Sequence, residues 1–270
     1  MDLINSYKEN GYVIVKNIVD ESLLDNHLLG IYNIFKIYCK PSDKLDNETQ
    51  PWKSIFFHNE IVEFRKSYPK LFSCFYDSLQ NCSTLTALVF SKNLIELSSK
   101  LLKINTNQLI TVGQQTRVDV PNDNRNILNW HQDWSYFPTT TKALTFWLPL
   151  LKMNDDTGYL RVLKNSHKAG AVSKISEKLD ENKLENQEYT VTHQVNIPNN
   201  IINKYKDIKV KITRGDVVFF DTCLFHRSGN NISDSIRFSC QNRLQDATAP
   251  DYVPFRLNIK TNPFKNINET

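Results

Sequence analysis

Hydrophobic positions in the first hundred residues repeat with the period of an α-helix. After Asp20, an apolar side chain recurs every three or four positions for several turns, which predicts an amphipathic helix with Asp20 as its N-cap. The same spacing runs through residues 59–103, with an interruption near Pro69 and a new start after Ser91. We therefore expect the N-terminal part of the chain, about residues 1–105, to be helical.

From residue 106 onward, the pattern changes to that of β-strands. Short runs rich in β-branched and aromatic residues are separated by turn residues, and a similar run lies near the N-terminus. This pattern favours an all-β barrel or sandwich as the core, over about residues 106–250. The predicted strands cover residues 11–16, 109–120, 143–151, 158–163, 190–197, 208–213, 216–221 and 235–244.

A variable insertion of about residues 168–207 interrupts the predicted β core. Its first half, residues 168–187, is rich in Lys, Glu and Asn, which is typical of an exposed loop or lid. The sequence shows no internal repeat and no linker between domains. We expect one domain, residues 1–270, with the N-terminal helices packed outside the β core.

The composition of the 270-residue chain is that of an ordinary globular protein. Its formal charge is only +4 and its basic residues are scattered, so we do not expect it to bind nucleic acid. The five cysteines include no Cys-x-x-Cys pair, which disfavours a disulfide framework or a thiolate zinc site. The sequence starts without a signal peptide and has no apolar stretch that could cross a membrane. These features predict a cytoplasmic protein with reduced thiols.

The segment WHQDWSYFP, residues 130–138, contains a candidate metal motif. His131 and Asp133 are two residues apart, so on a strand their side chains share a face. From this pair alone, a hydrogen-bonded strand pair is the favoured interpretation. His226, at the end of an apolar strand, can supply a third ligand from a distant part of a barrel. Two histidines and one carboxylate form the facial triad of non-haem iron(II) oxygenases, which leaves room on the metal for 2-oxoglutarate and dioxygen.

An arginine on the following predicted strand fits the same chemistry. Arg237 comes eleven residues after His226, and a buried guanidinium can hold the distal carboxylate of 2-oxoglutarate through charge-assisted hydrogen bonds. Ser228 could add a hydroxyl donor. The alternative is a surface ion pair, because strand position alone does not fix which face of Arg237 is inside.

Together with the segments around them, these motifs resemble the phytanoyl-CoA dioxygenase family of iron(II)- and 2-oxoglutarate-dependent oxygenases. The resemblance covers most of the chain and lies in ENGYVIVKN, WHQDWSYFP, GYLRVLKNSHKAG and RGDVVFFDTCLFHRSGNNISDSIR. It implies a double-stranded β-helix, a jelly-roll barrel with helices packed outside. It also implies hydroxylation of an unactivated C–H bond of a small molecule, with release of succinate and carbon dioxide. The residues that match the family's functional positions are His131, Asp133 and His226 as iron ligands, Arg237 and Ser228 on 2-oxoglutarate, and Trp147 lining the cosubstrate pocket.

Substrate contacts are less well defined by the sequence. Gln115 and Arg117 alternate on one strand face, in a pattern that resembles family members acting on small polar molecules. Asp119 lies on the same face, so Arg117 either pairs with Asp119 or reaches the substrate. Because the family more often has an amide at position 119, we do not expect Asp119 to bind 2-oxoglutarate. Further candidates for the substrate pocket are Trp134, Tyr136 and Arg243. This set suggests a polar or carboxylate-bearing substrate and leaves a fatty acyl-CoA open.

The other histidines have no ligand-type neighbours in the sequence. We interpret His27 and His58 as core or surface residues and His167 as a structural loop residue, while His193 has no assigned role. Three alternative functions compete with the oxygenase. Asp133 argues against a halogenase, which needs a small residue there. A non-enzymatic jelly-roll binding module and a hydrolase with zinc in the same ligands remain as alternatives.

Overall fold

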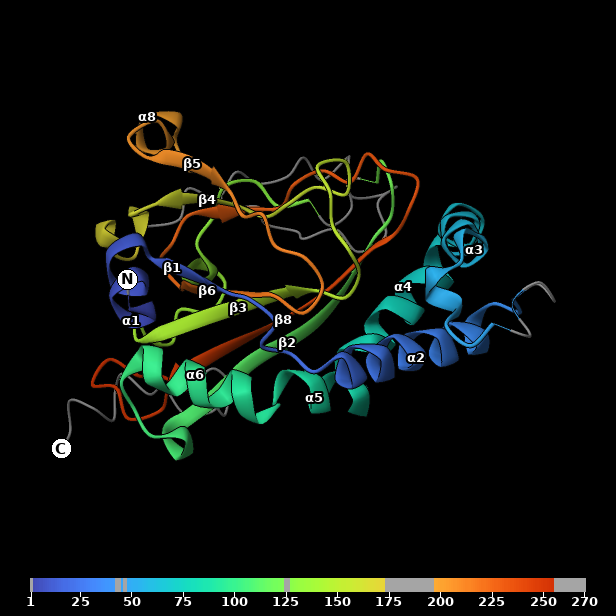
Figure 1. Ribbon diagram of the computed structural model, residues 1–270. Coiled ribbons are helices and arrows are strands. Elements are labelled where there is room, and N and C mark those ends of the chain that lie inside the picture. Colours follow the sequence, from blue (N-terminus) through green and yellow to red (C-terminus); the bar gives the residue numbers. More distant parts are fainter. Residues whose placement is uncertain (1, 42–44, 46–47, 124–126, 173–196, 255–270) are drawn as a thin grey trace, which may run out of the picture.

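Two antiparallel β-sheets face each other in the computed structural model, which describes residues 2–41, 45, 48–123, 127–172 and 197–254. The larger sheet has the strand order β1-β6-β3-β8-β2, and the smaller has the order β5-β4-β7. Figure 1 shows the smaller sheet lying across from the larger one, which is the arrangement of a jelly-roll. The strands are β1 Tyr12–Val15, β2 Leu109–Asp119, β3 Ala143–Pro149, β4 Arg161–Lys164, β5 Lys206–Lys209, β6 Val217–Asp221, β7 His226–Arg227 and β8 Arg237–Asp246.

Helices from the N-terminal part cover the outer face of the larger sheet, with α2, α5 and α6 beneath it in Figure 1. The expected helix after Asp20 is present, although the side chain of Asp20 makes no capping hydrogen bond. Pro69 begins a helix, where its missing N–H costs nothing. The helices are α1 Leu3–Asn10, α2 Glu21–Tyr38, α3 Ile55–Ser67, α4 Pro69–Ser78, α5 Ser83–Val89, α6 Lys92–Leu102 and α8 Asn199–Ile202.

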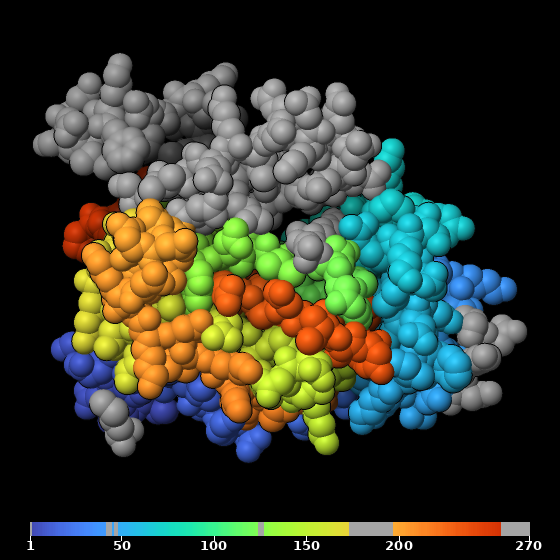
Figure 2. Space-filling model, turned by 90° about the horizontal axis from the view of Figure 1, so that it is seen from above, coloured from blue at the N-terminus to red at the C-terminus, as the bar shows by residue number. Residues whose placement is uncertain are grey.

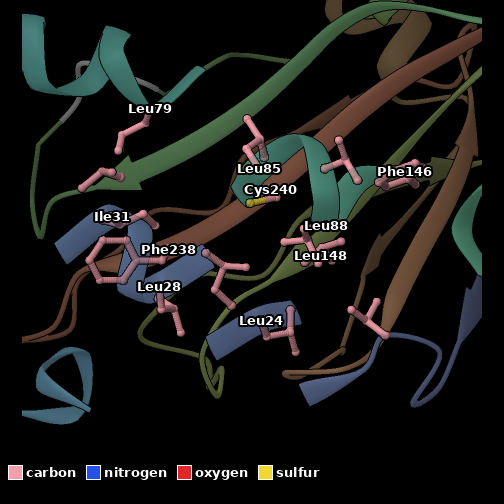
Figure 3. Close-up of a cluster of buried hydrophobic side chains, with 14 of the residues drawn as sticks. Leu24, Leu28, Ile31, Leu79, Leu85, Leu88, Phe146, Leu148, Phe238 and Cys240 are labelled. Carbon is pink, nitrogen blue, oxygen red and sulfur yellow. The ribbon is translucent and has the colours of Figure 1, made fainter. Parts of the chain in front are cut away.

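The two faces of β8 differ in chemistry, because alternate residues of a strand point to opposite sides. Phe238, Cys240 and Leu244 are buried against the helices. Phe238 stacks on Phe57 of α3, with ring centroids 6.2 Å apart. Figure 3 shows how side chains of α2 and α5 meet this side of the sheet. This apolar layer anchors the sheet, and its opposite face is left for polar residues.

Toward the barrel interior, β8 presents Arg237, Ser239, Gln241 and Arg243. The register pairs these four with Asp119, Arg117, Gln115 and Gly113 of β2, respectively. Two neighbouring strands therefore place a dense polar surface inside the barrel. The rest of the interior is apolar and lies around Trp147 of β3, which packs with Val162, Val218, Phe220 and Leu224.

The double-stranded β-helix with helices outside is confirmed as the fold class. Two local expectations differ from the structure. Residues 210–213 were predicted as part of a strand, but β5 covers Lys206–Lys209 and thus begins within the predicted insertion. Helix α1 was not predicted, because Tyr7 is its only buried residue and the sequence therefore gives it no apolar stripe.

Part of the predicted insertion and the predicted strand at 190–197 fall largely outside the described residues, as does His193. Viewed from above, α8 and β5, in orange, lie on one side of the described surface, and α3 and α4, in cyan and blue, lie on the other (Figure 2). Within the described ranges, every helix is too short or too polar to span a membrane.

Candidate metal centre and adjoining pocket

His131, Asp133 and His226 come together inside the barrel. One ligand atom from each lies within 4.8 Å of the other two, and all three residues are buried. The backbones of His131 and His226 are paired by two hydrogen bonds of 3.1 and 3.0 Å. The prediction that His131 and Asp133 lie on one strand is wrong. His131 forms an isolated bridge, and Asp133 begins a short 3-10 helix, Asp133–Ser135.

Both imidazole rings are oriented by a hydrogen bond to a backbone carbonyl. Nδ1 of His131 lies 2.7 Å from the carbonyl oxygen of Asn129, and Nδ1 of His226 lies 3.0 Å from that of Leu224. A carbonyl oxygen only accepts, so each Nδ1 carries the proton. Each Nε2 is then unprotonated and carries a lone pair that can bind a metal ion. The two Nε2 atoms lie 3.9 and 3.8 Å from Oδ1 of Asp133. This orientation is the one that a histidine metal ligand requires.

The two oxygens of Asp133 have different partners. Oδ1 faces the imidazoles, and it also accepts a hydrogen bond of 3.2 Å from Nη2 of Arg243. Oδ2 accepts a hydrogen bond from the hydroxyl of Thr145 on β3 and lies 3.1 Å from Nε of Arg243. The carboxylate is thus fixed on its outer side and presents one oxygen to the histidines.

The electrostatics keep the triad in the protonation state that binds a cation. Burial would raise the pKa of Asp133, but Arg243 and the two imidazoles hold the pKa of this carboxyl far below its usual value. Burial lowers the pKa of His131 to about 3, with the neighbouring His226 acting in the same direction. Burial likewise lowers the pKa of His226. At neutral pH the cluster therefore consists of two neutral imidazoles and one carboxylate, the form that metal ions bind.

The residue between the first two ligands has a structural role. Gln132 is fully buried and points away from the triad. Its side-chain amide donates to the carbonyl oxygens of Gly170 and Cys223 and accepts from the backbone N–H of Val172. It therefore holds the backbone between the two ligands against two neighbouring loops.

Arg237 faces the barrel interior, beside the triad, and is nearly saturated by protein groups. Its Nε and Nη2 both donate to Oδ2 of Asp119, at 3.0 and 2.9 Å. Its Nη1 donates to three backbone carbonyls, those of Thr157, Gly158 and Gly229. The alternative of an exposed surface ion pair is thus ruled out, since the side chain is 4% exposed.

Asp119 bridges two arginines. Its other oxygen, Oδ1, accepts a hydrogen bond of 3.0 Å from Nη2 of Arg117. Burial would raise the pKa of Asp119, but the two guanidinium groups hold it below its usual value. The ion pair between Arg117 and Asp119, one of the two options from the sequence, is therefore present. Arg237 joins this pair to form a buried cluster of three charged residues.

The other two residues expected near 2-oxoglutarate lie in different surroundings. Trp147 is buried in the apolar cluster between the sheets. Ser228 lines a small surface cavity together with Asp155, Arg161 and Lys209. The next residue, Gly229, contacts Arg237: its carbonyl oxygen accepts a hydrogen bond of 2.8 Å from that arginine.

A cavity of about 320 Å³ adjoins the triad. Of the predicted substrate residues, the structure brings four to it, while Trp134 does not line it. Tyr136 connects the cavity to the metal ligands, because its ring packs edge-on against that of His131. The lining residues are Gln80, Gly113, Gln114, Gln115, Arg117, Leu128, Tyr136, Phe137, Gln241 and Arg243.

Three residues at the site were missed or misjudged from the sequence. Thr145 was missed, although it alternates with Trp147 on the same face of β3. Ser239, two residues after Arg237, was missed too; it is fully buried, and its hydroxyl has no hydrogen-bond partner within the described residues. For Asp119, the sequence predicts the pair with Arg117 but not the contact with Arg237. Strand alternation counted from Arg237 could have identified Ser239.

The comparisons with known proteins agree with this fold. The sequence model of the family described as phytanoyl-CoA dioxygenase (PhyH) matches residues 7–239. Among curated proteins, none matches the chain in sequence.

Three solved structures illustrate the structural likeness. The epimerase SnoN, in complex with Fe3+, alpha ketoglutarate and nogalamycin RO, superposes with a TM-score of 0.61 at 16% identity, over 94% of this chain and 86% of SnoN. The carbocyclase SnoK, from nogalamycin biosynthesis, gives 0.57 at 16%, over 98% of this chain and 89% of SnoK. EctD from S. alaskensis, with bound Fe, gives 0.57 at 14%, over 94% of this chain and 79% of EctD. At these identities the likeness concerns the fold.

Proposed function

The chain belongs to the phytanoyl-CoA dioxygenase family, and from this premise we propose that it is an iron(II)- and 2-oxoglutarate-dependent dioxygenase that hydroxylates a small molecule. The observation that supports this most directly is the buried cluster of His131, Asp133 and His226, whose ligand atoms lie within 4.8 Å of one another. Two neutral imidazoles and one carboxylate suit iron(II) and leave half of an octahedral shell open.

Bound iron(II), with 2-oxoglutarate and dioxygen, supplies an oxidant for an unactivated C–H bond; one oxygen atom enters succinate and the other enters the product, and carbon dioxide leaves. The protein's own part is to hold the ligands and to orient the two organic molecules. Thr145 and Arg243 fix Asp133, and backbone carbonyls fix the two imidazole rings.

For the cosubstrate, Arg237 is the proposed partner of the distal carboxylate, and Trp147 and Ser228 are the further candidates from the family pattern. The charge of its cluster supports this role: two buried guanidinium groups share one carboxylate, that of Asp119, so one positive charge is uncompensated. An uncompensated buried charge is costly, and an anionic ligand would relieve it. Nη2 of Arg237 uses one of its two hydrogens on Asp119, and the buried hydroxyl of Ser239 lies on the same face as a further donor.

The experiment combines metal binding with a spectrum. Protein prepared without oxygen should bind one iron(II) per chain and, with 2-oxoglutarate, develop a weak visible charge-transfer band. His131→Ala and His226→Ala should each abolish the band. His167→Ala is the matched control, because that histidine is bonded to the carbonyl of Lys8, away from the triad. A band that survives both ligand substitutions, or zinc retained in preference to iron with no band, would refute the assignment.

The type of oxidation is tested by the product mass. SnoN is described as an epimerase and SnoK as a carbocyclase, so the same fold carries other outcomes in those proteins. Hydroxylation adds one oxygen atom to the substrate, epimerisation leaves its mass unchanged, and ring closure removes two hydrogens. Gain of one oxygen, together with equimolar succinate, is the result that we expect.

A further inference from the structure

We propose that the substrate is a compact monoanion, such as a small carboxylate, and that Arg243 binds its negative group. This inference rests on the proposed oxygenase function and goes further by naming the substrate class. It is drawn from the cavity beside the triad and from the fixed charges of the barrel interior.

The position of the cavity makes it the natural substrate site. It shares Tyr136 and Arg243 with the surroundings of the triad: the ring of Tyr136 contacts that of His131, and Arg243 contacts Asp133. Its volume of about 320 Å³ is at the lower end of the range for small-molecule pockets. A ligand that fills it would therefore be small and would lie next to the metal ligands.

The lining of the cavity is cationic and amide-rich. Two arginines and four glutamines line it, and none of its described lining residues is acidic. Glutamine amides donate and accept hydrogen bonds, so they suit a polar ligand rather than a hydrocarbon chain. Leu128, Tyr136 and Phe137 supply the apolar part of the wall.

The charges of the interior can be added up from the described residues. Arg117, Arg237 and Arg243 contribute +3 and Asp119 and Asp133 contribute −2, which leaves +1. The two histidines count as neutral, because metal-bound imidazole is neutral. Iron(II) adds +2 and the 2-oxoglutarate dianion adds −2, so the loaded site again carries +1. A substrate with one negative charge would make it neutral, and charge neutrality matters in a buried site.

Of the three arginines, Arg243 is best placed to receive that charge. Arg237 is assigned to the distal carboxylate of 2-oxoglutarate in the proposed function, and Arg117 is held by Asp119. Arg243 contacts the side chain of Asp133, and its buried Nε has no well-aligned hydrogen bond within the described structure. Its guanidinium carbon lies 4.7 Å from the ring centroid of Phe137, and both residues line the cavity.

Gly113 keeps open the space in front of Arg243. It lies directly across from Arg243 in the strand pairing, next to a bulge in β2. A Cβ at this position would be 3.8 Å from the ring of Phe137 and 3.9 Å from Nη1 of Arg243, which are ordinary contact distances. A larger side chain here would therefore take up cavity volume without a backbone clash.

The test uses the iron- and 2-oxoglutarate-loaded enzyme with matched probes. Benzoate, phenylacetate and hexanoate are each compared with the corresponding neutral primary amide, and palmitoyl-CoA serves as a long acyl probe. Without oxygen, binding is followed as a shift of the charge-transfer band; with oxygen, as stimulated succinate release. We expect at least one small carboxylate to bind at least tenfold more tightly than its amide and to stimulate succinate release.

Variants connect the preference to the proposed residues. Arg243→Met should reduce the carboxylate-over-amide preference at least tenfold, whereas Arg161→Met, which removes the same charge from an exposed pair with Asp207, should not. Gly113→Val should weaken binding of the carboxylate while the band with 2-oxoglutarate still forms. Arg243→Lys should restore part of the preference that Arg243→Met loses.

The failure of this inference can be told apart from failure of the proposed function. If the band forms but only amides or palmitoyl-CoA shift it and stimulate turnover, the substrate class is wrong and the oxygenase assignment stands. An unchanged preference in Arg243→Met would overturn the role of Arg243. Absence of the band in the wild-type enzyme would overturn the proposed function first.

Discussion

Asp119 meets Arg237 through a single oxygen, because Oδ2 accepts hydrogen bonds from both Nε and Nη2 of the arginine at 3.0 and 2.9 Å. The second oxygen of Asp119 is thereby left for Arg117. This geometry fixes the plane of the Arg237 guanidinium and leaves its cluster with one uncompensated positive charge.

The first prediction concerns that charge. Arg237→Ala should raise the KM for 2-oxoglutarate more than a hundredfold, since loss of one partner of a buried charge pair costs about 3–5 kcal/mol. The fold should persist, because Asp119 keeps its contact with Arg117. Steady-state succinate formation at varied 2-oxoglutarate measures the effect, with Arg161→Ala as a control in an exposed pair. An unchanged KM would mean that another cation holds the distal carboxylate.

The second prediction compares two serines. Ser239→Ala should weaken 2-oxoglutarate binding by about 1–2 kcal/mol and leave the free energy of unfolding unchanged or higher, because the lost hydroxyl is buried without a partner. Ser228→Ala should cost about 1 kcal/mol or less. Titration of the charge-transfer band and urea unfolding give the two quantities. Equal 2-oxoglutarate affinity in wild type and Ser239→Ala would remove Ser239 from the cosubstrate site.

The third prediction concerns the hydroxyl that fixes Asp133. Thr145→Val preserves the shape of the side chain but removes its hydrogen bond to Asp133, and groups behind a metal ligand typically contribute about 10–100-fold in affinity. We expect a loss of iron(II) affinity in that range, measured by competition with a chelator. Thr116→Val is the matched control, because Thr116 lies on the other face of the sheet and contacts His27. Equal losses in both variants would point to a general effect on the sheet.

The fourth prediction concerns pH. Burial lowers the pKa of His27 from 6.5 to about 4. The unfolded chain therefore takes up a proton at this residue below pH 6.5, while the folded chain does not until about pH 4, so acid favours unfolding. Between pH 7.5 and 5, His27 should cost the protein about 2 kcal/mol of stability, at about 1.36 kcal/mol per pH unit.

Urea unfolding of the wild type and of His27→Gln at these two pH values isolates that contribution. The wild type should lose about 2 kcal/mol more than the variant does as the pH falls from 7.5 to 5. Parallel pH dependence in the two proteins would show that folding does not lower the pKa of His27.

The three residues of the proposed metal centre could be singled out from the sequence because the assignment depends on residue types and on a known family pattern, and the structure brings them together. The sequence could not tell whether the side chain of Arg237 points into the barrel, because both faces of β8 hold buried side chains. In the structure, Phe238 stacks on Phe57 on the helix side of the sheet, so the neighbouring Arg237 points to the barrel interior. The local conformation of the motif was also out of reach, because His131 forms a backbone bridge to the distant His226 and Asp133 already begins a 3-10 helix.

The partners of the buried charges were the other feature that the sequence left open. Nothing in the spacing between Arg243 and Asp133 indicates their contact, which arises where β8 passes the start of a 3-10 helix. For Asp119, alternation predicted the pair with Arg117, but not that Arg237 shares the same carboxylate, because this depends on the register between β2 and β8. Register is a long-range property of the sheet.

The alternation along β8 makes this enzyme suited to redesign. Phe238, Cys240 and Leu244 belong to the layer that holds the sheet to the helices, whereas Gln241 and Arg243, on the opposite face, line the proposed substrate cavity. On the proposed function, the positions that set substrate preference thus alternate along this strand with the positions that anchor the sheet. A combinatorial library restricted to Gln241 and Gly113 would sample new cavity shapes, while Phe238, Cys240 and Leu244 keep the scaffold intact and Arg243 keeps its contact with Asp133.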